Sequence, residues 1–273
     1  MLILHRNPED SPQWKLFRQN SGRFETVSFA EGLRGLYSCG PQVPATASFE
    51  TGNLGIPPEE PLEAPFGGTK ILCVGRNYRP HAEELGNPIP AEPLWFTKPP
   101  SSLLAHGGTV LLPSGVGRVD FEGEMALLIG KTGKSIRADS AWEYIAGVCP
   151  ALDITARELQ KKDGQWTRAK GFDTFCPLGP GWVPFHPDWA SARLTTELND
   201  KVVQQDSLTS LIFSIPRLIE HISDCMTLCP GDVILTGTPA GVGPLAAGDR
   251  LRVSLESSSL IVLEVEVANR STP

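Results

Sequence analysis

The sequence predicts an α+β protein that is mostly β. Short apolar segments bounded by Gly, Pro, Asn or Asp recur along the 273 residues, which is typical of strands joined by turns. Helical periodicity is confined to a few short segments, such as Ile212–Met226. A hydrophobic fraction of 40% with 20% charged residues is ordinary for a globular chain.

Residues 1–68 differ in texture from the rest of the chain. The elements expected here are short strands at Leu2–His5, Trp14–Arg18 and Arg23–Phe29 and a short helix near Phe29–Tyr37. Residues 40–68 are rich in Pro, Gly and small residues, as in a linker. We therefore predict a small N-terminal domain and linker at 1–68, followed by a main domain at 69–273.

In the main domain, strands are expected where short apolar runs meet turn residues. The expected strands and hairpins are Ile71–Val74, Trp95–Lys98, Thr109–Pro113, Val119–Gly130, Leu194–Gln205 around Asn199-Asp200, Asp249–Leu255 and Leu260–Val267. The remaining expected helices are Arg79–Asn87, with Pro80 in its first turn, and Ser140–Cys149.

Charge and composition exclude several classes of function. The net charge of −7, with no block of Lys or Arg, argues against nucleic acid as a partner. No apolar run approaches the roughly 20 residues of a membrane span, and the N-terminus lacks the apolar core of a signal peptide. The six cysteines are scattered, as in a reducing compartment. We expect a cytoplasmic protein that binds no membrane.

Common nucleotide and hydrolase motifs are missing. The segment Gly130–Ser135 resembles the end of a phosphate-binding loop, but Leu128 stands where the first glycine is required. No G-x-G-x-x-G opens a helix, and no G-x-S-x-G occurs. Nucleotide binding and serine-hydrolase chemistry are therefore unsupported.

The segment Val119–Gly130 carries an unusual set of acids. Side chains of a strand alternate between faces, so Asp120, Glu122 and Glu124 are expected on one face. Alternating acids are also found on ordinary solvated strands. Beside an apolar run, however, a carboxylate cluster suits a hard divalent cation.

Four other residues could join this cluster. Asp153 ends an apolar segment just before a helix, where it would act either as an N-cap or as a third carboxylate on the same ion. His81 and Glu84 share a helix face, either as a surface ion pair or as a base whose tautomer the carboxylate fixes. Lys170 lies among aromatic residues, where a snorkelling surface lysine is the plainer interpretation.

Several motifs together resemble the fumarylacetoacetate hydrolase family. The motifs, in order, are Val-Gly-Arg-Asn-Tyr-x-x-His-x-x-Glu, Val-Asp-Phe-Glu-Gly-Glu-Met-Ala, Leu-Asp-Ile-Thr-Ala-Arg-Glu-Leu-Gln, Lys-Gly-Phe-Asp, Ile-Phe-Ser-Ile-Pro and Leu-Thr-Gly-Thr-Pro-Ala-Gly-Val-Gly-Pro. The first is similar to the acylpyruvase and oxaloacetate-decarboxylase branch. The resemblance covers about residues 69–268 and implies a mixed β-sandwich or roll with short helices, commonly as a homodimer.

The resemblance also implies roles for particular residues. The implied metal ligands, for Mg²⁺ or Mn²⁺, are Glu122, Glu124 and Asp153. The implied water-activating dyad, on a lid helix, is His81 and Glu84. The residues implied to lie near the substrate are Lys170 and Gln160, at its developing negative charge, and Arg76, Tyr78 and Thr238.

The predicted function is a divalent-metal-dependent hydrolase that cleaves a C–C bond in an acylpyruvate or another 2,4-diketo acid. The metal would stabilise the enolate that bond cleavage leaves behind. Oxaloacetate decarboxylation and isomerisation of a hydroxymuconate-type dienoate need the same metal and base, and they stay open as alternatives. A non-catalytic β-rich protein with structural Ca²⁺ would have no use for His81 and Glu84.

Overall fold

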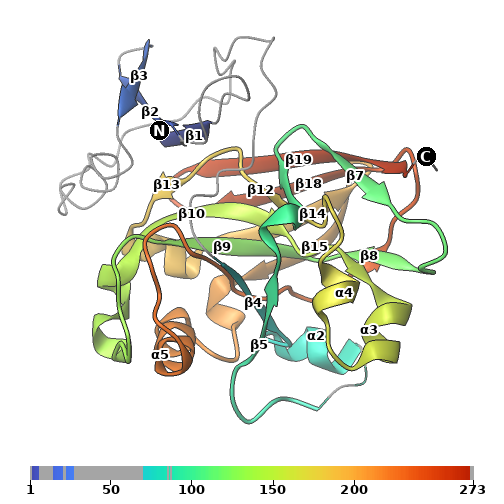
Figure 1. Ribbon diagram of the computed structural model, residues 1–273, viewed down its shortest axis with the longest axis horizontal. Coiled ribbons are helices and arrows are strands. Elements are labelled where there is room, and N and C mark those ends of the chain that lie inside the picture. The colour runs from blue at the N-terminus through green and yellow to red at the C-terminus, as the bar shows by residue number, and fades with distance from the viewer. Residues whose placement is uncertain are drawn as a thin grey trace.

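A computed structural model describes residues 70–84, 86 and 88–270 (Figure 1). In the N-terminal segment it describes the strands β1 (Leu2–His5), β2 (Lys15–Asn20) and β3 (Arg23–Val27), which form an antiparallel sheet in the order β1-β2-β3. The helix expected near Phe29–Tyr37 and the linker at 40–68 lie outside the described residues. The division into two domains stays a prediction.

An eight-stranded mixed sheet forms the centre of the main part of the chain. Its strand order is β5 (Leu94–Lys98), β4 (Ile71–Gly75), β16 (Val233–Leu235), β9 (Gly123–Ile129), β10 (Ile145–Leu152), β12 (Cys176–Leu178) and β6 (Leu103–Ala105), and β13 (Val183–Pro184) pairs with β10. Every residue of β9 and β10 is buried. These strands therefore read as continuous apolar runs, because both faces of the sheet are covered.

A five-stranded sheet covers one face of the central sheet. Its order is β15 (Lys201–Ser207), β14 (Arg193–Leu198), β18 (Arg250–Glu256), β19 (Leu260–Asn269) and β7 (Thr109–Leu112). In β19, Ile261, Leu263, Val265 and Val267 are buried and the residues between them are more exposed. This alternation places one apolar face against β9 and β10, and the core lies between the two sheets.

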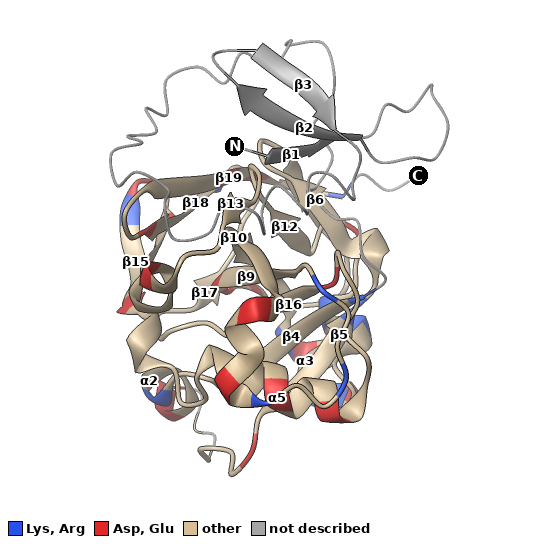
Figure 2. Cartoon of the chain, turned by 90° about the vertical axis from the view of Figure 1, so that its left-hand side faces the viewer, with Lys and Arg blue, Asp and Glu red and all other residues tan. Residues whose placement is uncertain are grey.

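The helices are short. They are α2 (Arg79–Glu84), α3 (Arg157–Asp163), α4 (Thr167–Lys170), α5 (Ile215–Cys225) and the 3₁₀ segments η1 (Pro100–Ser102), η2 (Ala138–Tyr144), η3 (Pro187–Ser191) and η4 (Leu208–Ser210). Two perpendicular views place α2, α3 and α5 at the end of the molecule opposite β18 and β19 (Figures 1 and 2). The predicted α+β, mostly β fold is confirmed.

One predicted helix is wrong. Residues 140–149 form the end of η2 and then most of β10, which pairs along its length with β9. A short apolar run is compatible with either a helix or a fully buried strand, and its periodicity does not decide between them. Residues 145–152 form a strand because their backbone groups hydrogen-bond to one edge of β9, which would otherwise be buried without partners.

The predicted acidic strand at 119–130 is interrupted at Glu122. Its first part, β8 (Val119–Phe121), belongs to a three-stranded sheet with β11 (Thr155–Ala156) and β17 (Gly243–Pro244), and its second part is β9. Glu122 lies at the junction of two sheets.

No helix in the described part of the chain is long and apolar enough to cross a membrane.

Candidate metal and acid-base site

Strand pairing brings the predicted ligands together. Glu124 on β9 lies opposite Ala151 on β10, and Asp153 follows the end of β10. The backbone N–H of Asp153 donates to the carbonyl oxygen of Glu122 at 2.9 Å. All three acids are buried, and each offers a carboxylate oxygen within 4.8 Å of the others. Asp153 is not an N-cap, because α3 begins at Arg157 after Ala156.

Two buried lysines contact this acid cluster. The Lys170 ammonium donates to Glu122 at 2.9 Å, to Asp153 at 2.5 Å and to the Thr155 hydroxyl at 2.8 Å. Lys98 donates to the other oxygen of Asp153 at 2.6 Å. Burial alone would lower the pKa of Lys170, but Asp153 and Glu122 outweigh it and raise that pKa. Lys170 is therefore held as a cation beside the acids.

The two glutamates differ in their electrostatic surroundings. Burial raises the pKa of Glu124 well above its usual range, and the nearby charges of Asp153 and Glu122 raise it further. The Gly237 N–H, which donates to Glu124 at 2.6 Å, opposes this only in part. Burial also disfavours the charge on Glu122, but Lys170 and Arg157 hold its pKa well below its usual range.

The donor set fits a hard divalent cation. Three buried carboxylates within 4.8 Å of one another supply the oxygen ligands that Mg²⁺ and Mn²⁺ prefer. The raised pKa of Glu124 shows that its negative charge lacks sufficient compensation from the protein. A bound cation would supply that compensation in place of a proton.

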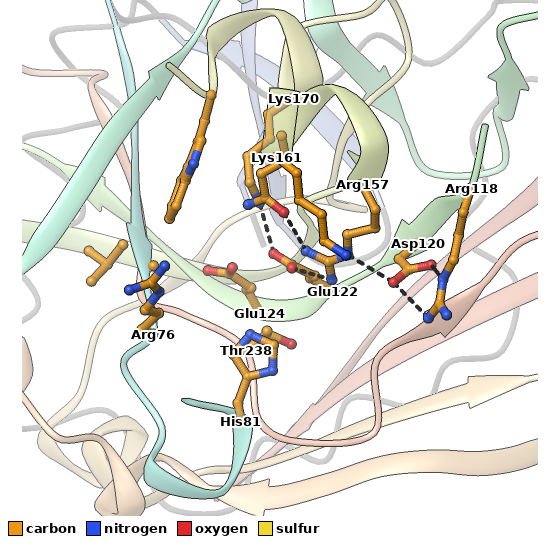
Figure 3. Close-up of a pocket in the computed structure, with 14 residues that line it drawn as sticks. Arg76, His81, Arg118, Asp120, Glu122, Glu124, Arg157, Lys161, Lys170 and Thr238 are labelled. Carbon is orange, nitrogen blue, oxygen red and sulfur yellow. Dashed lines mark hydrogen bonds and ion pairs between the residues drawn. The ribbon is translucent and has the colours of Figure 1, made fainter. Parts of the chain in front are cut away.

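His81 projects from α2 toward the same acids (Figure 3). Its side chain is buried, and burial lowers the pKa of the imidazole below 6.5, so the neutral form prevails at neutral pH. Nδ1 lies 3.5 Å from Glu84 Oε2 and makes no hydrogen bond to the described residues. The carboxylate of Glu84 accepts the Gly241 N–H at 3.1 and 3.2 Å, which ties α2 to the glycine loop after β16.

Glu122, Glu124, His81 and Lys170 line one cavity of about 330 Å³, whereas Asp153 and Lys98 do not line it. Its lining consists of Val74, Gly75, Arg76, His81, Arg118, Asp120, Glu122, Glu124, Arg157, Gln160, Lys161, Trp166, Lys170 and Thr238. Of the residues implied to contact substrate, Arg76, Gln160 and Thr238 line this cavity and Tyr78 does not. The Tyr78 ring is fully buried, and its hydroxyl has no hydrogen-bond partner among the described residues.

Basic residues that the sequence analysis did not single out complete the site. Arg157 donates to Asp120 at 2.8 Å, forms an ion pair with Glu122 at 2.7 Å and donates to Gln160 at 3.0 Å. Arg118 binds Asp120 through two donors, at 2.6 and 3.0 Å. Arg157 belongs to the same motif as Asp153 and Gln160, so its place in the sequence could have indicated a site residue. Nothing local marks Lys98, whose partner Asp153 is distant in the sequence.

The fold and the site define a strand-dominated enzyme scaffold with a candidate site for a divalent cation. The family model described as "Fumarylacetoacetate (FAA) hydrolase C-terminal" matches residues 70–268. The chain therefore belongs to the fumarylacetoacetate hydrolase family. Members of this family generally depend on a divalent metal, and the acidic cluster of this chain agrees with such a dependence.

Relatives with named activities include a tautomerase, a decarboxylase and an isomerase. The chain is 44% identical to a mitochondrial oxaloacetate tautomerase of Arabidopsis thaliana, over 73% of this chain and 92% of that one. It is 42% identical to a mitochondrial oxaloacetate decarboxylase of Dictyostelium discoideum, over 69% and 89%. It also resembles the structure of a 5-carboxymethyl-2-hydroxymuconate delta-isomerase from Mycobacterium smegmatis, with a TM-score of 0.71, 41% identity and coverage of 77% and 80%. These names favour the alternatives over the predicted hydrolase.

Proposed function

We propose that this protein is a divalent-metal-dependent enzyme that interconverts the keto and enol forms of oxaloacetate or a closely similar 2-oxo dicarboxylic acid. One observation carries the proposal: a buried, neutral histidine lines the same cavity as Glu122 and Glu124, two of the three carboxylates that converge. Tautomerisation needs a base beside the acidic carbon and a means to stabilise the enolate, and nothing else. Relatives named for oxaloacetate support the choice of substrate.

Each candidate residue has a role in this reaction. Glu122, Glu124 and Asp153 would hold Mg²⁺ or Mn²⁺, and the cation would supply Lewis-acid polarisation of the 2-oxo group. The neutral His81 accepts the proton from C3 of the keto form, and the enolate oxygen is then protonated to give the enol. Glu84 orients the imidazole through Nδ1, which lies 3.5 Å from its carboxylate. Lys170 adds positive charge beside the enolate.

The cavity suits a substrate with a second carboxylate. Arg118, Arg157 and Lys170 line it but are each paired with acids of the site. Arg76 and Lys161 also line it, and neither forms an ion pair with any described residue. The guanidinium of Arg76 instead lies 5.9 Å from the centre of the Trp166 ring. These two cations are available for the distal carboxylate of a dicarboxylic acid.

The backbone of Arg76 supports its assignment to substrate binding. Its φ of 56° is in the left-handed region, which a residue with a Cβ adopts at a conformational cost. Gly75 precedes it, and a Cβ there would lie 2.8 Å from Trp166 Cζ3. The chain thus turns sharply at the end of β4 beneath Trp166. This turn directs Arg76 into the cavity.

Decarboxylation of oxaloacetate is the second candidate. It passes through the same enolate, and a relative bears that name. Loss of CO₂ needs no proton removal from C3, so it does not require His81 as a base. Hydrolysis of an acylpyruvate would need His81 to activate water instead.

A substrate panel tests the proposal. Chelated protein and protein reconstituted with Mg²⁺ or Mn²⁺ would be given enol-oxaloacetate, keto-oxaloacetate and an acylpyruvate. We expect metal-dependent loss of the enol absorbance that is faster than pyruvate release and faster than acylpyruvate cleavage. Pyruvate release at the rate of enol loss would instead assign the decarboxylase. Acylpyruvate cleavage as the fastest reaction would restore the hydrolase prediction.

A further inference from the structure

A single buried glutamine connects the acid pair to the substrate side of the cavity. Gln204 lies on β15, which belongs to the second sheet, and its side chain is 1% exposed. Its Oε1 accepts the Gly123 N–H at 2.9 Å. Its Nε2 donates to the Thr238 hydroxyl and to the Pro239 carbonyl, both at 2.8 Å. The amide thus uses its acceptor and both of its donors.

One end of this amide holds the peptide between the two candidate metal ligands. Gly123 separates Glu122 from Glu124, at the junction of β8 and β9. A Cβ on Gly123 would lie 2.0 Å from the Thr196 hydroxyl and 3.1 Å from Gln204 Oε1. The glycine therefore permits the close approach of its backbone to Gln204 that the hydrogen bond needs. Through this bond, Gln204 holds the Gly123 peptide at a fixed distance from β15 of the second sheet.

The other end of the amide acts on Thr238, which lines the cavity. A hydroxyl has one donor and two acceptor positions. Because Gln204 donates to Thr238 Oγ1, the hydroxyl hydrogen remains available to a ligand in the cavity. The same loop places the Gly237 N–H on Glu124 at 2.6 Å. Thr238 and Glu124 are thus set relative to each other through one loop and one glutamine.

We infer that Gln204 is a positioning residue: its amide orients the Thr238 hydroxyl as a donor to a bound carboxylate or enolate and holds Thr238 in register with the Glu122–Glu124 pair. Gln204 does not itself line the cavity, so it acts through Thr238 and the peptide of Gly123. Its effect on turnover rests on the proposed function. Its effect on ligand binding does not.

Gln204→Glu is the informative variant, because glutamate keeps the length and the acceptor for Gly123 but, even when protonated, has only one donor and cannot serve both Thr238 and Pro239. Gln205→Glu is the matched control: Gln205 is next on β15, is exposed and donates only to Thr195, at 3.2 Å. The measurements are the affinity for oxalate of Mn²⁺-loaded protein, the Mn²⁺ affinity, KM, kcat and the melting temperature. Oxalate is an unreactive dicarboxylate, so its affinity can be measured whichever substrate the enzyme converts.

Loss of a buried donor predicts about a tenfold weaker affinity for oxalate in Gln204→Glu. KM should rise more than kcat falls, and Gln205→Glu should match the wild type. Thr238→Val should weaken oxalate binding to a similar extent, and Thr238→Ser should not. In the Thr238→Val background, Gln204→Glu should add less than twofold, since both changes remove the same donor.

Different failures are distinguishable. Oxalate affinity within twofold of wild type in folded Gln204→Glu, with only a lower melting temperature, would show a merely structural glutamine and overturn the inference. If Gln204→Glu does not fold, equal oxalate affinities of Thr238→Val and Thr238→Ser would overturn it. A wild type without turnover on oxaloacetate, together with the expected oxalate pattern, would refute the proposed function and leave the inference standing.

Discussion

At the scale of single residues, Glu124 shows how a site can favour a cation before one binds. It is fully buried, its neighbours include Asp153 and Glu122, and its pKa is raised well above its usual range. In the absence of metal this raised pKa favours the neutral, protonated form of the carboxyl. A glutamine at this position would then resemble the metal-free side chain in both shape and charge.

Glu124→Gln should therefore separate metal binding from folding. We expect the metal-free variant to differ from metal-free wild type by less than about 1 kcal/mol in free energy of unfolding. In the wild type, Mn²⁺ at 100 times its Kd should add about 2.7 kcal/mol. The variant should lose most of this gain. Thermal melts with and without Mn²⁺ measure both quantities, and a full stabilisation of the variant by Mn²⁺ would rule out Glu124 as a ligand.

The other residue-scale prediction concerns pH. Burial lowers the pKa of His81 below 6.5, so the base is neutral above that lowered value and protonated below it. The rate of tautomerisation should be constant at neutral pH and fall as the pH drops through the lowered pKa. His81→Ala should reduce kcat/KM by roughly 100-fold or more and abolish this acid limb. A pH–rate profile of both proteins tests this, and an unchanged limb in His81→Ala would assign it to another group.

At the scale of elements, α3 places adjacent lysines in different surroundings. Lys161 lines the cavity, whereas Lys162, next to it on the same helix, does not. Both side chains are exposed, so they differ in position and not in burial. This pair isolates the effect of a positive charge at the mouth of the cavity.

Lys161→Ala should raise KM for oxaloacetate by about two- to fivefold, the range expected for one exposed charge pair. Lys162→Ala should leave it unchanged. For a 2-oxo acid with a single carboxylate, neither substitution should matter. Steady-state kinetics on both substrates decide the point. An equal effect of Lys161→Ala on the two substrates would show that this lysine does not recognise the distal carboxylate.

At the scale of the whole molecule, the described strands of the N-terminal segment pair only with one another. The family model begins at residue 70, at the start of the central sheet. Among the residues whose burial the structure describes, which begin at Lys70, the core clusters already join both sheets of the main part of the chain. A main domain that carries its own core would fold without residues 1–68.

A truncated chain of residues 69–273 should keep the Mn²⁺ affinity and kcat of the full protein within about twofold, since the described groups of the site all lie beyond residue 70. Calorimetric titration and steady-state kinetics measure these quantities. A truncated chain that is folded but binds no metal would make the N-terminal segment part of the site. Light scattering on both chains would test the predicted homodimer, and cytoplasmic location likewise stays a prediction.

Sequence patterns were enough to predict the mostly β fold class, the positions of most strands, and the acids Glu122, Glu124 and Asp153 that lie together in the structure. These features are local: alternation, turn residues such as Asn199-Asp200, and apolar runs follow from short-range backbone and packing rules. Motifs in a fixed order supplied the family. The fold class and family are confirmed, whereas the roles of the site residues stay predictions.

Other features, namely the strand at β10 and the partners of buried polar side chains, could be assigned only from the folded chain. Local periodicity did not separate a helix from a strand at 140–149, because the hydrogen-bond partner of β10 is a strand earlier in the chain. The same holds for Lys98 and Gln204, whose partners Asp153, Gly123 and Thr238 are distant in sequence. A buried polar side chain acquires its role from the groups that satisfy it, and the folded chain alone brings those groups within hydrogen-bonding distance.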